Sequence, residues 1–233
     1  MSRGKILFIT GTDTGAGKTV LTALLLAHLR SQGVEALAMK PICTGSRSDV
    51  RFLQSFQSGE LSDEVMNPFW FKTPAAPIVA AKNCREKPTQ ARLKRSVQGL
   101  QKKCDILLVE GAGGLMVPLA HKLTWEGIIK SLKCSVLVAA KNELGVINHS
   151  LLTMGRLQLI GVKRLGLCLV NQVSDGKKSS CPAVQNARVL REFTEECSIF
   201  EIPFLGGKRM SSGRIEASQN KLKKSLAQIL KIV

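Results

Sequence analysis

The chain has 233 residues, of which 44% are hydrophobic, so it can bury a sizeable core and is not intrinsically disordered. It contains no apolar run long enough to cross a bilayer, and its N-terminal apolar run is only about four residues, shorter than that of a secretory signal, so we expect a cytoplasmic protein without membrane partners. The net charge of +17 favours anionic ligands, so we expect the protein to attract ATP and other anions. A nucleic-acid partner is not expected, because the basic residues are spread along the chain, tyrosine is absent and aromatic residues make up only 4%.

The first predicted element is a buried strand over residues 6–9, which leads through the glycine-rich segment 11–19, GTDTGAGKT, into a run of helix formers. Strand, glycine-rich loop and helix form the arrangement that binds phosphate, because glycines let backbone N–H groups point at one anion and the helix adds its positive end. Lys18 would reach the terminal phosphates and the Thr19 hydroxyl would bind Mg²⁺. Because Thr12 stands where the usual pattern has glycine, a glycine-rich turn with an incidental Gly-Lys-Thr is the alternative.

A second strand is predicted over residues 34–40, and a proline and a glycine after it require a loop at its carboxyl end. Ligands of open parallel sheets bind at that edge, so Lys40 would face the same crevice as Lys18, although an ordinary surface lysine fits the spacing equally well. Asp49, at the start of a short amphipathic helix, either serves as a first-turn acid or faces the magnesium ion.

A third strand, residues 105–110, carries four apolar residues and ends in Glu110. An acid at the tip of a buried parallel strand faces the metal in nucleotide-binding folds, and the alternative is an acid that caps a turn. The glycine-rich run 111–114 that follows would let the backbone approach phosphate closely.

Two further buried strands are predicted over residues 135–140 and 164–171, with a helix between them for which Asn148 is a plausible N-cap. The second strand ends in Asn171 and Gln172, a polar pair that reads a purine edge or caps a turn. A short strand, 199–202, then leads through residues 203–207 back to the crevice. The basic amphipathic C-terminal segment packs on the sheet or anchors the protein to a membrane.

Alternating strands and helices predict an α/β protein with the three-layer α/β/α fold of P-loop NTPases, a mostly parallel central sheet and a single domain over residues 1–233. The seven cysteines are odd in number and show no C-x-x-C spacing, which favours reduced thiols over disulfides or a zinc site.

Together these motifs resemble the ATP-dependent dethiobiotin synthetases of biotin biosynthesis. The resemblance extends from residue 6 to about 205 and is carried by Thr10-Gly11-Thr12-Asp13-Thr14, Gly17-Lys18-Thr19, Lys40-Pro41, Thr44-Gly45, Ser48-Asp49, Asn67-Pro68, Pro74, Pro77, Val109-Glu110-Gly111-Ala112-Gly113-Gly114, Gly145, Ile147-Asn148-His149, Val170-Asn171 and Ile202-Pro203. The segment Thr-Gly-Thr-Asp-Thr before Gly-Lys-Thr is specific to this family and accounts for the glycine spacing.

The resemblance implies an enzyme, a carbon–nitrogen ligase that closes a ureido ring on 7,8-diaminopelargonic acid with carbon dioxide, ATP and Mg²⁺. One substrate amine traps carbon dioxide as a carbamate, the carbamate attacks the γ-phosphate, and the second amine displaces phosphate. The implied catalytic residues are Thr14, Lys18 and Lys40. The implied ATP-binding residues are Gly15, Ala16, Gly17, Lys18, Thr19, Val20, Asp49, Glu110, Gly111, Ala112, Gly113, Asn171, Gln172, Pro203, Phe204 and Leu205.

Thr14, Lys40 and Thr44 would hold the diamine, and Thr19, Asp49 and Glu110 would bind the metal. The substrate carboxylate would lie at a helix N-terminus of a partner subunit, around Gly145, Val146, Ile147 and Asn148, which implies a homodimer with sites at the interface. The alternatives are a partition-type P-loop ATPase, which usually has a lysine where this chain has Asp13, and a nucleic-acid-associated ATPase.

Overall fold

The computed structural model describes residues 4–172, 183–194, 197–206 and 211–233. Its central sheet has six strands in the order β10-β9-β8-β1-β5-β2, and every neighbouring pair is parallel. These strands are β1 Lys5–Gly11, β2 Ala36–Met39, β5 Ile106–Glu110, β8 Ser135–Lys141, β9 Leu165–Val170 and β10 Ser198–Ile202.

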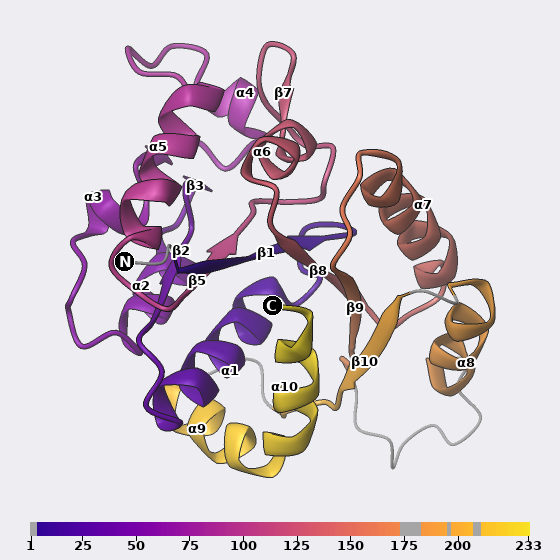
Figure 1. Cartoon of the computed structure of the whole chain (residues 1–233). Coiled ribbons are helices and arrows are strands. Elements are labelled where there is room, and N and C mark those ends of the chain that lie inside the picture. The colour runs from indigo at the N-terminus through magenta and orange to yellow at the C-terminus, as the bar shows by residue number, and fades with distance from the viewer. Residues whose placement is uncertain (1–3, 173–182, 195–196, 207–210) are drawn as a thin grey trace.

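Helices cover both faces of this sheet (Figure 1). One face carries α1, α9 and α10, and the other carries α5, α6, α7 and α8, so the predicted three-layer α/β/α fold with a parallel sheet is confirmed. The main helices are α1 Lys18–Ser31, α5 Gln90–Gln101, α6 Trp125–Leu132, α7 Val146–Leu159, α8 Ala183–Phe193, α9 Ser212–Lys221 and α10 Lys223–Ile229, which a 3₁₀ turn, Leu230–Ile232, follows.

The central strands are buried along almost their whole length. In β1 every residue after Lys5 is buried, and β8 and β9 show the same continuous burial. A strand covered by helices on both faces has no solvent side, which is why these segments read as apolar runs and not as alternating patterns. The carboxyl ends of β1, β2, β5, β8 and β9 therefore meet at one edge of the sheet.

The connection between β2 and β5 contains several short elements, of which sequence analysis predicted the amphipathic helix that begins near Asp49. The strand β3, Ile42–Thr44, pairs in parallel with β4, Phe69–Phe71, and residues 45–68 form the crossover between them. A second small sheet joins β6, Pro118–Ala120, to β7, Leu123–Thr124. The short helices between β2 and β5 are α2 Ser48–Gln54, α3 Asp63–Met66 and α4 Pro77–Ala80.

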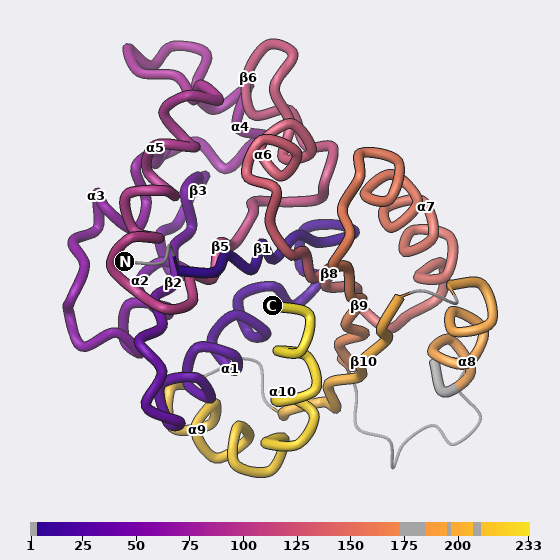
Figure 2. The backbone as a smooth tube through the Cα atoms, viewed as in Figure 1, coloured from indigo at the N-terminus to yellow at the C-terminus, as the bar shows by residue number. Residues whose placement is uncertain are grey.

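The C-terminal segment packs against the body of the protein, as one of the two alternatives predicted. This segment forms two helices, α9 and α10, which are separated at Leu222. Figure 2 shows both helices beside α1, and Ile215, Leu226 and Ile229 are fully buried. Among the described residues, no helix is both long and apolar enough to span a membrane.

The start of α7 differs from the prediction, and the cysteines agree with it. The prediction of Asn148 as the N-cap of α7 is wrong, because the helix begins at Val146 after Gly145, whose φ of 92° lies in the left-handed region that glycine adopts without strain. The six cysteines of the described ranges are free thiols, as expected, whereas Cys181 lies outside the described residues.

Candidate active site

The glycine-rich loop joins β1 to α1 at the carboxyl edge of the sheet. Gly17 precedes the helix with a φ of 88°, and a Cβ atom there would lie 2.9 Å from Val170 Cγ1, so both the backbone and the space require glycine. The Lys18 side chain curls back along the loop, and its Nζ donates to the Asp13 carbonyl at 2.7 Å. Gly11 makes room for it, since a Cβ there would lie 2.9 Å from Lys18 Nζ.

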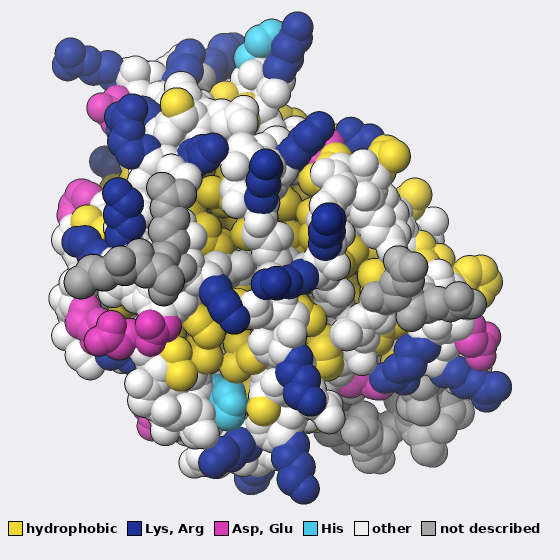
Figure 3. All heavy atoms as spheres, viewed as in Figure 1, with side chains coloured by type: hydrophobic (Ala, Val, Ile, Leu, Met, Phe, Trp, Pro, Cys, Tyr) yellow, Lys and Arg dark blue, Asp and Glu magenta, His cyan; other side chains and the backbone are white. Residues whose placement is uncertain are grey.

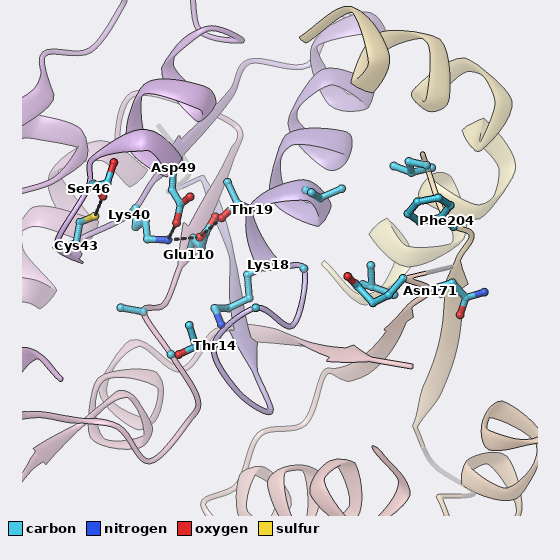
Figure 4. A pocket seen from close by; sticks show the side chains of 18 of the residues that line it. Thr14, Lys18, Thr19, Lys40, Cys43, Ser46, Asp49, Glu110, Asn171 and Phe204 are labelled. Atoms are coloured by element: carbon cyan, nitrogen blue, oxygen red, sulfur yellow. Dashed lines mark hydrogen bonds and ion pairs between the residues drawn. The ribbon is translucent and has the colours of Figure 1, made fainter. Parts of the chain in front are cut away.

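Lys40, Asp49 and Glu110 form a charged cluster beside the loop (Figure 4). Lys40 Nζ lies 2.6 Å from Glu110 Oε1 and 2.5 Å from Asp49 Oδ2. Lys40 and Glu110 are buried, whereas the Asp49 carboxylate is half exposed. The contact follows from strand register, because Met39 pairs with Val109 and the next residue of each strand is Lys40 and Glu110.

Burial and charge act on the two buried lysines in different ways. Burial lowers the pKa of Lys18 to about 8; the Glu110 carboxylate opposes this shift and the Lys40 charge reinforces it. Burial also disfavours the charged form of Lys40, but the adjacent carboxylates of Glu110 and Asp49 outweigh it and raise its pKa above the ordinary lysine value. Lys40 is therefore a permanent cation at the strand tip, and Lys18 is a cation that binding of phosphate would stabilise.

Thr19, Asp49 and Glu110 bring a set of oxygen atoms together at this point. Thr19 Oγ1 donates to Glu110 Oε1 at 2.7 Å, and Glu110 Oε2 is buried with no hydrogen-bond partner among the described residues. An uncompensated carboxylate oxygen beside a hydroxyl and a second carboxylate suits a hard cation. Mg²⁺ takes one or two carboxylates, waters and substrate phosphates, and this set of donors fits that ion.

Asn171 and Phe204 lie on one side of the pocket and the charged cluster lies on the other, and Lys18 lies between the two sides (Figure 4). Asn171 follows β9, and its backbone N–H donates to the Ile202 carbonyl at 2.9 Å, which brings the 203–206 loop against it. Phe204 is 38% exposed, so an aromatic face is open to a flat ligand here. This end of the pocket combines apolar and aromatic side chains with the amides of Asn171 and Gln172, whereas the other end is charged.

One cavity of about 540 Å³ joins these parts, a volume typical of a small-ligand site. The predicted residues that line it are Thr14, Gly15, Gly17, Lys18, Thr19, Val20, Lys40, Thr44, Asp49, Glu110, Ala112, Gly113, Asn171, Gln172, Pro203, Phe204 and Leu205. Ala16 and Gly111 belong to the same loops but are buried beneath the cavity wall. Sequence reasoning missed Cys43, Ser46 and Val170, whose only signal was that each adjoins a predicted residue or loop, whereas Gly206 lies in the segment 203–207 that was predicted to return to the crevice.

Gly145, Val146, Ile147 and Asn148 do not line this cavity. They begin α7 at the carboxyl end of β8. The next residue, His149, lines a separate cavity of about 460 Å³ with Thr12, Asp13 and Gly114, on the other side of the loop. Within one chain, the predicted carboxylate site and the ATP site therefore lie apart.

Comparison with known proteins places the chain among nucleotide-dependent enzymes. A family described as an AAA domain matches residues 5–207. The "ATP-dependent dethiobiotin synthetase BioD" of Anaeromyxobacter sp. is 38% identical over 76% of this chain and 80% of its own length. The proteins of that name from Methanocaldococcus jannaschii and Nitrosopumilus maritimus are 34% and 30% identical, over 73% and 86% of this chain and 81% and 90% of theirs.

The similarity to solved structures concerns the fold alone, because their sequence identity to this chain is low. The MinC:MinD cell division protein complex of Aquifex aeolicus matches with a TM-score of 0.59 at 14% identity, covering 95% of this chain and 96% of that one. The structure of pNOB8 ParA bound to nonspecific DNA matches with a TM-score of 0.59 at 13% identity, covering 98% and 99%.

Proposed function

The chain belongs to the ATP-dependent dethiobiotin synthetase family, and from this we infer that it forms dethiobiotin in biotin biosynthesis. The reaction that follows is the ring-closing carboxylation of 7,8-diaminopelargonic acid with carbon dioxide, at the expense of ATP. It is a carbon–nitrogen ligase reaction that yields dethiobiotin, ADP and phosphate. A carbamate forms on one amine and attacks the γ-phosphate, which releases ADP and gives a carbamic–phosphoric anhydride. The second amine then attacks the carbonyl carbon of this anhydride, forms the second C–N bond of the ring and displaces phosphate.

The position of Lys40 beside Lys18 is the observation that supports this reaction most strongly. A generic phosphate-loop ATPase has no chemical use for a buried lysine at the tip of the second strand. A synthetase has one, because carbamate formation places a new negative charge beside the γ-phosphate, and fixed cations favour that charge in the transition state. The raised pKa of Lys40 supports a residue that stays protonated throughout turnover.

The remaining side chains would position the reactants. Lys18 would neutralise the terminal phosphates, and the Thr14 and Thr44 hydroxyls, which line the same cavity, would hold the diamine. Asn171 and Gln172 would contact the adenine edge, with Pro203, Phe204 and Leu205 against its face. The distribution of charge along the cavity supports this orientation of ATP, with phosphates at the lysines and base at the amide.

Thr19, Asp49 and Glu110 would hold Mg²⁺, which neutralises charge on the β- and γ-phosphates when it is bound. The orphaned Glu110 Oε2 supports this assignment, since a buried carboxylate oxygen without a donor is costly unless a cation or water reaches it. The half-exposed Asp49 lies on the solvent side, where its carboxylate would help to hold the ion.

A homodimer would bring Gly145 to Asn148 of one subunit to the active site of its partner. Exposed apolar side chains support this arrangement, because Leu152 of α7 is 66% exposed and Met116, beside the second cavity, is 54% exposed. Leu152→Glu should then produce a monomer in light scattering and lower diamine-dependent turnover. A dimer that persists with full activity would place the interface elsewhere. We retain a single domain over residues 1–233 and a cytoplasmic location as further proposals.

The alternative, a partition-type or nucleic-acid-associated ATPase, has little support at the site. Asp13 stands where partition ATPases have a second lysine, and Lys and Arg side chains are scattered over the face shown in Figure 3 instead of forming one tract. The test is ADP release with and without 7,8-diaminopelargonate, in the presence of bicarbonate and Mg²⁺. Release that depends on the diamine is expected, whereas release that ignores the diamine and responds to DNA would contradict the proposal.

A further inference from the structure

Three asparagine side chains form a directed chain of hydrogen bonds that ends at the base side of the pocket. Asn186 Nδ2 donates to Asn142 Oδ1 at 2.8 Å, and Asn142 Nδ2 donates to Asn171 Oδ1 at 2.7 Å. Asn142 and Asn186 are buried, at 7% and 6% exposure, and neither lines the pocket. Only Asn171 reaches it.

The arrangement follows from the register of two neighbouring strands. Lys141 of β8 pairs with Val170 of β9, so the residues that follow, Asn142 and Asn171, lie next to each other at the sheet edge. The Asn142 N–H donates to the Val170 carbonyl at 3.0 Å, which continues the ladder by one residue. The helix α8 then brings Asn186 over Asn142. Backbone pairing thus holds two of the three amides at fixed positions.

We propose that Asn142 and Asn186 are positioning residues that fix which way the Asn171 amide faces, so that its Nδ2 donates to N7 of a purine nucleotide. An asparagine amide has a donor end and an acceptor end, and a half-turn exchanges them. The bond from Asn142 occupies the acceptor end of Asn171. Its donor end has no protein acceptor among the described residues, so it is available to the ligand.

The purine N7 is the base atom that suits this donor. It is an acceptor on adenine and on guanine, and pyrimidines lack it. A donor whose orientation is already fixed loses less freedom on binding than one that turns freely. The proposal rests on the proposed function in one respect, namely that ATP is the nucleotide bound between Lys18 and Phe204.

Calorimetric binding of ATP and of 7-deaza-ATP, which has carbon in place of N7, tests the proposal without any turnover. The wild-type protein should bind 7-deaza-ATP about 3- to 10-fold more weakly than ATP, the range for one net hydrogen bond. Asn142→Asp keeps the shape of the side chain, but the carboxylate that replaces the amide can only accept hydrogen bonds. It should turn the Asn171 amide over, so that the ratio of the two affinities falls to about 1, as for a lost hydrogen bond.

Asn142→Ala and Asn186→Ala should lower the ratio in the same direction, with melting temperature measured for each variant to separate misfolding from lost positioning. Asn220→Asp makes the same chemical change on an exposed position of α9 and should leave the ratio unchanged. Equal wild-type affinities for ATP and 7-deaza-ATP, or an unchanged ratio in folded Asn142→Asp, would overturn the proposal. Dethiobiotin formation by the wild-type protein is measured separately. If product forms, the proposed function stands even when the binding experiments overturn the role of Asn142 and Asn186.

Discussion

The ammonium of Lys40 lies 2.6 Å from Oε1 of Glu110, at the tips of two adjacent parallel strands. Asp49 holds the same ammonium from the solvent side at 2.5 Å. The lysine that would stabilise the carbamate is therefore bound to both carboxylates that would serve the metal. A bound metal ion and Lys40 would share these carboxylate oxygens, so a change at one of the three residues is expected to affect the others.

Lys40→Ala should reduce diamine-dependent turnover by about 10²–10³ while ATP affinity changes little, because the lysine acts on charge that develops in the reaction. It should also destabilise the protein by about 3–5 kcal/mol, because Glu110 is left buried without its partner. Calorimetry, product formation and urea unfolding measure the three effects.

The double variant Lys40→Ala/Glu110→Gln separates stability from catalysis. Removal of both charges should recover most of the lost stability but none of the activity. Activity that returns together with stability would mean that Lys40 only holds the fold.

Glu110→Gln should raise the Mg²⁺ concentration that gives half-maximal activity, because the amide keeps the shape but loses the charge that attracts the ion. Glu60→Gln is the matched control, since Glu60 pairs with Arg30 far from the pocket. An Mg²⁺ titration that is unchanged in Glu110→Gln would assign this carboxylate to Lys40 and the turn alone.

The pKa of Lys18, about 8 in the free protein, predicts a pH-dependent affinity for ATP. Phosphate binds the protonated lysine, so affinity should fall as pH rises through about 8, and binding above that pH should take up a proton. Calorimetry in two buffers of different ionisation enthalpy measures this uptake. In Lys18→Arg the guanidinium stays protonated, so proton uptake should vanish, and uptake that persists would exclude Lys18 as its source.

The same shift has a consequence for folding. The pKa of Lys18 is lowered on folding from 10.5 to about 8, so the unfolded chain binds more protons between these values. The contribution of Lys18 to stability therefore rises with pH across that window and is unfavourable below it. Nucleotide binding should remove this penalty by restoring a counter-charge.

Gly17→Ala should abolish nucleotide binding, because alanine resists a φ of 88° and its Cβ would collide with Val170. Gly99→Ala is the control. Gly99 lies in α5 with open space around it and no positive φ, so alanine there should stabilise the helix by about 0.5–1 kcal/mol. Normal ATP binding by Gly17→Ala would show that the loop does not need this conformation.

The alternation of strands and helices predicted the fold, and the family resemblance implied most of the pocket residues; one physical reason explains why these residues meet. Parallel strands end at one edge, so the residues after β1, β2, β5 and β9 had to meet there. The Lys40–Glu110 contact and the amide chain through Asn142 depend on strand register, which no local pattern specifies. The pairing of β3 with β4 likewise joins segments whose sequences give no sign of each other.

The incorporation of labelled carbon dioxide into dethiobiotin, measured against ADP release, tests the central claim most directly. With 7,8-diaminopelargonate, the wild-type protein should incorporate about one carbon per ADP, and Lys40→Ala should lose both by the same factor of about 10²–10³, as expected for a residue that stabilises the transition state. ADP released without labelled product, or product formed at the wild-type rate by Lys40→Ala, would contradict the account.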